Sequence, residues 1–188
     1  MKSGILSDTE QSGIPITEEA IQRVPLVRPE GWTEEQAAKL QQAHRELLRS
    51  VVGKPVGTEA GAIYSPDLKL LERRTGEDAT QQISMPRYDE PHILIHNHPS
   101  GATFSAEDIK SFILREHTGL MTAVGNSGKV FLLAKSEQYD GFKAYLSFNE
   151  EDKILSELVQ KQDLNGYLVE IEKYLRGMES YGVEFIEG

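Results

Sequence analysis

Two histidines spaced i, i+2, His96 and His98, stand at the end of the short apolar run 93–95. In a strand, residues i and i+2 point to the same face, and their Cα atoms lie roughly 6.5 Å apart. Both imidazole rings can therefore reach one metal ion. Pro99 follows directly and ends the strand. The pair predicts two metal ligands at the end of a buried strand.

A third ligand is available in the tetrad Ser105-Ala106-Glu107-Asp108. The spacing of Ser105 and Asp108 is that of a helix capping box, which puts Asp108 on the first helical turn, from where it can turn back toward the ion. A capping box alone is usually no more than a helix start, and a His-x-His pair alone can arise by chance. Their co-occurrence gives two histidines, one carboxylate and an open fourth position, the pattern of a catalytic zinc ion.

Hydrolysis at such a site also needs a general base near the water that the metal activates. Glu59 is the best candidate, because it opens the apolar segment 60–64, where a charged side chain is otherwise out of place. The alternative is a glutamate at a strand edge that faces solvent, and without other information that alternative is favoured.

The composition excludes several other chemistries. The chain of 188 residues has no cysteine, so disulfides, cysteine-bound zinc and thiol catalysis are excluded. A net charge of −10 argues against sequence-independent nucleic-acid binding and favours a peptide or basic protein as partner. No run is long enough for a membrane helix, and residues 1–8 lack the hydrophobic stretch of a secretory signal. We therefore expect a cytoplasmic protein without a membrane partner.

Hydrophobic periodicity and turn residues predict the elements that position these side chains. A helix is expected to begin at Thr33 with a capping box and to bury the stripe Leu40, Ala43, Leu47, Leu48 and Val51. A second helix is expected over 105–117, ended by Gly119, and helices follow from Asn149 with a break at Asn165-Gly166. Strands are expected over 56–64, 68–72, 92–96, 120–124, 130–134 and 182–186, with a further short one near 82–85.

This order of elements predicts an α/β (α+β) sandwich, in which helices flank a mixed central β-sheet. We expect three parts. Residues 1–32 form an N-terminal extension without a clear period, residues 33–148 form the domain that carries the metal ligands, and residues 149–188 form a helical C-terminal extension packed on that domain.

Together, Glu59, the His-x-His-Pro run and Ser-x-x-Asp resemble the signature of the JAB/JAMM (MPN) metalloprotease superfamily. The form His-Asn-His-Pro-Ser-Gly, residues 96–101, is most similar to its bacterial RadC-like and phage- or mobile-element-associated branches. The resemblance covers about residues 56–135. It implies a cytidine-deaminase-like JAB/MPN fold and a zinc-dependent metallopeptidase or isopeptidase that cleaves an amide bond in a protein or peptide.

The resemblance also implies a role for each residue of the motif. It implies one Zn²⁺ bound by His96, His98 and Asp108, a general acid and base in Glu59, and a hydrogen bond from Ser105 to the oxyanion. The stretch between Pro99 and the serine, residues 100–104, is one residue shorter than is usual in the family. Ser100 is an alternative source of the hydroxyl, although a turn role fits it better.

Substrate and activity stay open at this point. Deubiquitinating relatives imply a ubiquitin-like protein as one class of substrate, and residues 75–91 are the stretch long enough to act as a flap over it. One alternative is a non-catalytic JAB-like interaction module, and another is a RadC-like protein linked to DNA processing. His92 lies too far along its strand to share an ion with His96, while His44 and His117 are interpreted as structural. The oligomeric state is not predicted.

Overall fold

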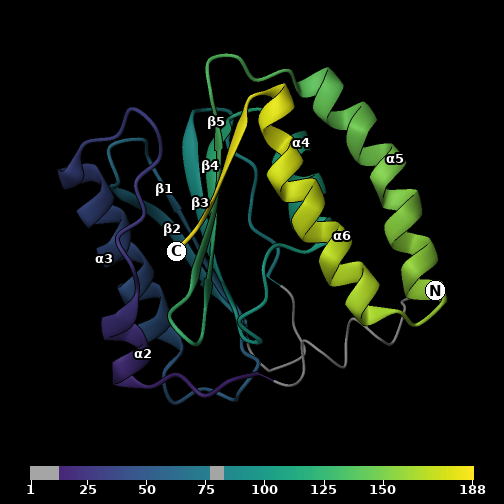
Figure 1. Ribbon diagram of the computed structural model, residues 1–188. Coiled ribbons are helices and arrows are strands. Elements are labelled where there is room, and N and C mark those ends of the chain that lie inside the picture. Colours follow the sequence, from purple (N-terminus) through teal and green to yellow (C-terminus); the bar gives the residue numbers. More distant parts are fainter. Residues whose placement is uncertain (1–12, 77–82) are drawn as a thin grey trace.

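The computed structural model describes residues 13–76 and 83–188. They form a mixed α/β protein in which a six-stranded sheet has helices on both faces (Figure 1), as the sequence predicts for the fold class. In chain order the elements are α2 (Glu18–Arg23), α3 (Glu34–Val51), β1 (Ala60–Tyr64), β2 (Leu70–Thr75), β3 (His92–His98), α4 (Ala106–Leu114), β4 (Thr118–Gly125), β5 (Val130–Lys135), α5 (Gly141–Gln160), α6 (Leu164–Gly177), the 3₁₀ helix η1 (Met178–Tyr181) and β6 (Val183–Glu187).

The strands lie in the order β2-β1-β3-β4-β5-β6. The neighbours β3 and β4 are parallel and are connected through α4, whereas the other neighbouring pairs are antiparallel. β3 therefore lies inside the sheet, where His96 faces Gly61 of β1 on one side and Ala123 of β4 on the other. The predicted metal ligands stand at the end of an interior strand with a fixed register.

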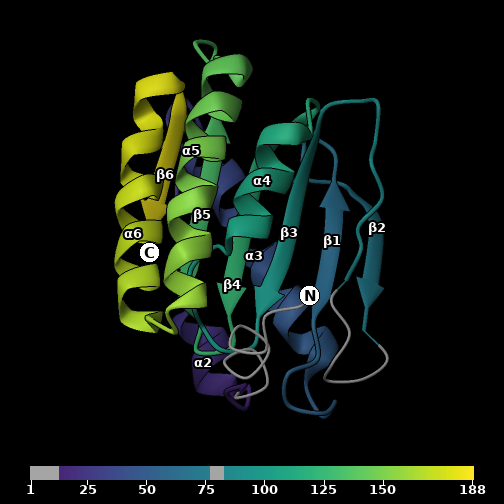
Figure 2. The same cartoon turned by 90° about the vertical axis from the view of Figure 1, so that its right-hand side faces the viewer.

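Side chains of β3 alternate between two hydrophobic layers. Leu94 belongs to the cluster under α4, α5 and α6, while Ile93 and Ile95 belong to the cluster under α2 and α3. The two helical layers lie on opposite sides of the sheet in Figure 1, and α4, α5 and α6 stand in front of it in Figure 2. Because alternate residues share a face, His96 and His98 share the face of Leu94, where α4 begins.

The first long helix forms as predicted. Thr33 caps α3 with its side chain, and the Gln36 side chain accepts from the Thr33 backbone in return. The apolar stripe predicted for this helix is buried. The extension before it has more structure than its sequence suggests, because α2 buries Ile21, and Val24 and Val27 pack in the same cluster as α3. A helix of six residues is too short to show a hydrophobic period.

Several expected element boundaries are wrong. β1 begins at Ala60 rather than at residue 56, and β2 covers Leu70–Thr75 rather than 68–72. α4 ends at Leu114, where the guanidinium of Arg115 donates to the carbonyls of residues 85 and 86, and Gly119 lies within β4. α5 begins at Gly141 rather than near 149, and it breaks before α6 at Gln162, which has a φ of 58°. The pair Asn165-Gly166 instead lies in the first turn of α6, because Asp163 caps that helix through the Gly166 N–H.

Two further strand predictions have different outcomes. Near 82–85, residue 82 is outside the described residues, and residues 83–85 form no strand. The last expected strand, 182–186, is confirmed as β6, which pairs with β5 and extends the sheet. The boundary expected between residues 148 and 149 falls inside α5. The C-terminal part also supplies β6, which belongs to the same sheet as the other strands. Among the described residues, no helix has the length and apolar character needed to cross a membrane.

His44 on α3 makes the stability of the protein sensitive to acid. Its side chain is fully buried, with Nε2 2.8 Å from Thr122 Oγ1, and burial lowers its pKa from 6.5 to about 3. Between those pH values the unfolded chain binds a proton there and the folded chain does not, so stability falls as the pH drops below 6.5. From pH 7 to pH 5, this histidine is expected to cost about 2 kcal/mol of unfolding free energy.

The test is urea unfolding of the wild type and of His44→Leu at both pH values. Between pH 7 and pH 5, the unfolding free energy of the wild type is expected to fall by about 2 kcal/mol more than that of the variant. This difference does not depend on how stable the two proteins are at pH 7. An equal loss in both proteins would show that another group carries the acid sensitivity.

Candidate metal centre

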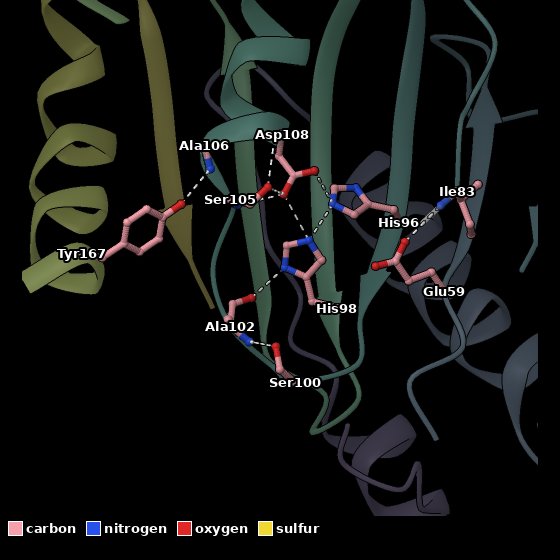
Figure 3. Close-up of polar contacts among 10 residues, drawn as sticks. All are labelled: Glu59, Ile83, His96, His98, Ser100, Ala102, Ser105, Ala106, Asp108 and Tyr167. Carbon is pink, nitrogen blue, oxygen red and sulfur yellow. Dashed lines mark hydrogen bonds and ion pairs between the residues drawn. The ribbon is translucent and has the colours of Figure 1, made fainter. Parts of the chain in front are cut away.

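Three side chains from two elements converge on one point, as Figure 3 shows. His96 and His98 come from the end of β3, and Asp108 comes from the first turn of α4. The two Nε2 atoms lie 2.9 Å apart, His96 Nε2 lies 3.4 Å from Asp108 Oδ1, and His98 Nε2 lies 3.2 Å from Asp108 Oδ2. Among the described residues this is the group of histidines and acids that can hold a metal ion.

These distances are compatible with a single metal ion held by the three side chains. Ligand atoms that lie 2.0–2.1 Å from one tetrahedral ion are about 3.3 Å from one another. The two Nε2 atoms lie 2.9 Å apart, while His96 Nε2 lies 3.4 Å from one carboxylate oxygen of Asp108 and His98 Nε2 lies 3.2 Å from the other. One ligand atom from each of the three residues lies within 4.8 Å of the other two. The donor set of two imidazole nitrogens and one carboxylate oxygen also suits Zn²⁺ and leaves a fourth position open. The chain therefore presents a set of ligands that can bind a single metal ion, as the spacing of the motif predicts.

The imidazole ring of His98 is held in the tautomer that a metal requires. Its Nδ1 lies 2.9 Å from the Ala102 carbonyl oxygen, which can only accept, so Nδ1 carries the hydrogen. In the neutral ring this leaves the Nε2 lone pair directed toward His96 and Asp108. Hydrogen bonds of this kind, from the second ring nitrogen to a carbonyl, orient metal-binding histidines in proteins.

Asp108 has two functions in the fold. It completes the capping box of α4: its N–H donates to Ser105 Oγ, and its Oδ2 accepts from the Ser105 backbone N–H at 2.8 Å. The Ser105 hydroxyl also donates to Oδ2, at 2.7 Å. The helix cap thus fixes the carboxylate while its oxygens face the two histidines. This geometry is compatible with both interpretations of Ser-x-x-Asp, as a helix cap and as part of a metal-ligand motif.

The charges in this group attract a cation. Burial raises the pKa of Asp108, but the charges and hydrogen bonds of His96 and His98 hold that pKa well below its usual value. Burial lowers the pKa of His98, but the hydrogen bond and charge of Asp108 outweigh burial. Together with the Ala102 carbonyl and the charge of Glu59, they raise the pKa to about 9. The site stabilises positive charge beside Asp108, which is what a divalent ion supplies.

Glu59 lies immediately before β1, the strand that pairs with β3. Its Oε2 accepts from the Ile83 backbone N–H at 3.1 Å, and its carbonyl accepts from the Gly76 N–H. Figure 3 shows the carboxylate beside His96, on the side of the histidines away from α4. Its negative charge raises the pKa of His98, and both residues line the same cleft. The fold therefore brings the predicted base and the predicted ligands to one cavity.

That cavity has a volume of about 380 Å³. Its walls are α4 on one side and residues 83–85 on the other, with Leu94 and Met121 among the apolar residues that line it. The wall at 83–85 is held by Arg115, whose guanidinium donates to the carbonyls of Met85 and Pro86 at 2.7 Å each. Sequence reasoning missed Arg115, because nothing local links the end of a helix to a loop so far away in the chain.

The short loop 100–104 reaches the helix because it packs tightly. Gly101 has a φ of 74°, in the left-handed region that favours glycine, and its Cα lies 2.9 Å from where a Cβ on Gly125 would stand. Ser100 Oγ accepts from the Ala102 N–H, which is the turn role expected for it. The loop of residues 100–104 therefore brings Asp108 to the histidines.

The remaining histidines lie outside this group. His92 is buried, its Nδ1 donates to the Glu90 carbonyl, and its Nε2 accepts from the Thr118 hydroxyl. His44 bonds to Thr122 on the opposite face of the sheet. His117 lies in the turn between α4 and β4 and is partly exposed. Among the described residues, none of these three belongs to the group of possible metal ligands.

Comparison with known proteins adds no independent support. Searches against protein-family models, curated proteins and solved structures give no significant match to this chain. The functional assignment therefore depends on the residues of the site themselves.

Proposed function

We propose that this chain is a zinc-dependent metallopeptidase or isopeptidase of the JAB/JAMM type. The observation that carries the proposal is the convergence of His96, His98 and Asp108, whose ligand atoms lie close enough together to hold one metal ion. Glu59 supplies a carboxylate in the same cleft. A metal ligand set with an open position, next to a potential base, is the arrangement that hydrolysis of an amide bond requires.

When bound, Zn²⁺ makes a water ligand more acidic and polarises a carbonyl group. Glu59 would accept a proton from the water that attacks the scissile carbonyl. It would then return that proton to the leaving amine. Ser105 donates a hydrogen bond to the carbonyl oxygen as negative charge develops there, a contribution of about 3 kcal/mol. For this step, the Ser105 hydroxyl must exchange its hydrogen bond to Asp108 for one to the substrate.

The proposed substrate is an extended segment of a protein or peptide, including the tail of a ubiquitin-like protein. The cleft runs between α4 and residues 83–85, and Arg115 fixes the second wall by its hydrogen bonds. A net charge of −10 favours such a substrate over a nucleic acid.

Digestion of a proteome-derived peptide library tests this function. The zinc-loaded chain is expected to generate new peptide ends that disappear with a zinc chelator and return when zinc is restored. His117→Ala, which changes a histidine outside the site, is the control and should cleave the same bonds. Stoichiometric zinc without any cleavage would instead support the non-catalytic interaction module. Retention on DNA that weakens with salt would support the DNA-linked alternative.

A further inference from the structure

Asn97 stands between the two histidines in sequence but points to the other face of β3. It is fully buried, on the side of the sheet that α2 and α3 cover. A buried primary amide needs partners for its oxygen and both its hydrogens. Asn97 has all three, and two of them are the backbone groups on either side of Glu59.

Two of the hydrogen bonds of Asn97 hold the backbone on either side of Glu59. Asn97 Oδ1 accepts from the Ala60 N–H at 2.5 Å, and Asn97 Nδ2 donates to the Thr58 carbonyl at 3.3 Å. The backbone pairing of β1 with β3 ends at Gly61 and His96, so the side chain of Asn97 continues the connection where the ladder stops. The peptide groups before and after Glu59 are thereby tied to the metal-binding strand.

Asn126 completes the network from the turn between β4 and β5. Its Oδ1 accepts the second hydrogen of Asn97 Nδ2 at 3.0 Å, and its own Nδ2 donates to the Ile14 carbonyl at 2.8 Å. Its backbone N–H donates to the His98 carbonyl at 3.2 Å. Asn126 is 4 % exposed, so both amides act in a medium with little water to replace a lost partner.

We propose that Asn97, oriented by Asn126, is the residue that positions Glu59 relative to the metal site. The inference deepens the proposed function and rests on it, because Glu59 is the base of that reaction. His96 and His98 bind the ion from one face of β3, and Asn97 holds the base-bearing segment from the other. A single tripeptide therefore fixes the separation between the ligands and the base.

Asn97→Asp tests this role with a side chain of the same shape. The aspartate keeps an oxygen for the Ala60 N–H but has no hydrogen for the Thr58 carbonyl or for Asn126. Small displacements of a catalytic group lower rates by up to about a hundredfold, so we expect a fall of about tenfold or more in kcat for the peptide substrate. KM should stay within about twofold, and the absorption spectrum of the cobalt-substituted protein should be unchanged, since the ligands keep their positions.

Three comparisons separate positioning from a general loss of stability. Thr122→Val removes another buried hydrogen bond on the same face of the sheet, that to His44, and is expected to retain wild-type kcat. In a Glu59→Gln background, Asn97→Asp should lower activity no further, because the two changes act through one group. Asn126→Ala removes the outer half of the network and is expected to give a smaller fall in kcat, which keeps the test available if Asn97→Asp does not fold.

Hydrogen exchange of the Ala60 amide gives a readout that needs no activity. In the zinc-loaded Asn97→Ala protein, which lacks the oxygen that accepts from the Ala60 N–H, this amide should exchange faster than in the wild type, while the amides of α4 keep their rates. Three results would overturn the inference: an Ala60 amide in Asn97→Ala that exchanges at the wild-type rate, a kcat for Asn97→Asp within about twofold of the wild type or matched by an equal loss in Thr122→Val, or an altered cobalt spectrum of Asn97→Asp. A wild-type chain without peptidase activity would overturn the proposed function alone, and the exchange measurement would then decide the role of Asn97.

Discussion

Glu59→Gln is expected to lower kcat for peptide hydrolysis by about a thousandfold while stoichiometric zinc stays bound. Glutamine has the size of glutamate and keeps an oxygen that can accept the Ile83 N–H, so the surrounding backbone should not move. It cannot take up a proton, and general base catalysis contributes about 10² to 10⁴ to such rates. Single-turnover cleavage and metal analysis of the same sample measure both quantities.

Glu116→Gln is the matched control, because it removes an exposed carboxylate in the turn that follows α4. It should cleave at the wild-type rate. If Glu59→Gln also retained full activity with zinc bound, another group would be the base, and the role assigned to Glu59 would be wrong.

His98→Ala is expected to abolish the stabilisation that zinc gives to the fold. The wild type should gain about 2.7 kcal/mol in unfolding free energy when free zinc is a hundred times its Kd, because the ion binds the folded chain alone. The variant loses a ligand and the hydrogen bond from Nδ1 to Ala102 that orients it. Thermal unfolding with and without zinc, together with metal content after dialysis, measures the difference.

His117→Ala controls for the loss of a histidine at another place, and its response to zinc should match that of the wild type. Stoichiometric zinc in the His98→Ala protein after dialysis would mean that the ion is held elsewhere, and the proposed metal centre would have to be abandoned.

The ligand set could be predicted because its geometry is local. A His-x-His pair in a strand fixes two side chains on one face, and a capping box fixes Asp108 on the first turn of the next helix. The short loop that joins the two elements leaves little freedom between them. Three residues close in sequence therefore suffice to predict a metal site, and the structure brings them together.

Glu59 and Asn97 show where such reasoning stops. The place of Glu59 depends on the antiparallel pairing of β1 with β3, which no local pattern specifies. Its position before an apolar segment made it a candidate, but only the family resemblance favoured it over a solvent-facing glutamate. Nothing in the sequence singles out Asn97, because its partners at Ala60, Thr58 and Asn126 belong to other segments. Contacts between distant segments depend on tertiary packing, which propensity and spacing do not describe.

The fold shows the same division. The capping box of α3 and the hairpin of β4 and β5 are local, and both are confirmed. The break between α5 and α6 was expected at Asn165-Gly166, but Asp163 caps α6 there and overrides the turn preference of that pair. α4 was expected to continue to His117, but its end is set by Arg115 and its bonds to Met85 and Pro86.

The two outer strands of the sheet carry charges that protect it from pairing with other chains. Exposed strand edges invite aggregation, and charged side chains on them are a common defence. At one edge, Arg73 and Arg74 of β2 form ion pairs with Glu46 and Glu72. At the other, Glu187 of β6 pairs with both Lys129 and Arg176. These charges disfavour the addition of a further strand at either edge of the six-stranded sheet.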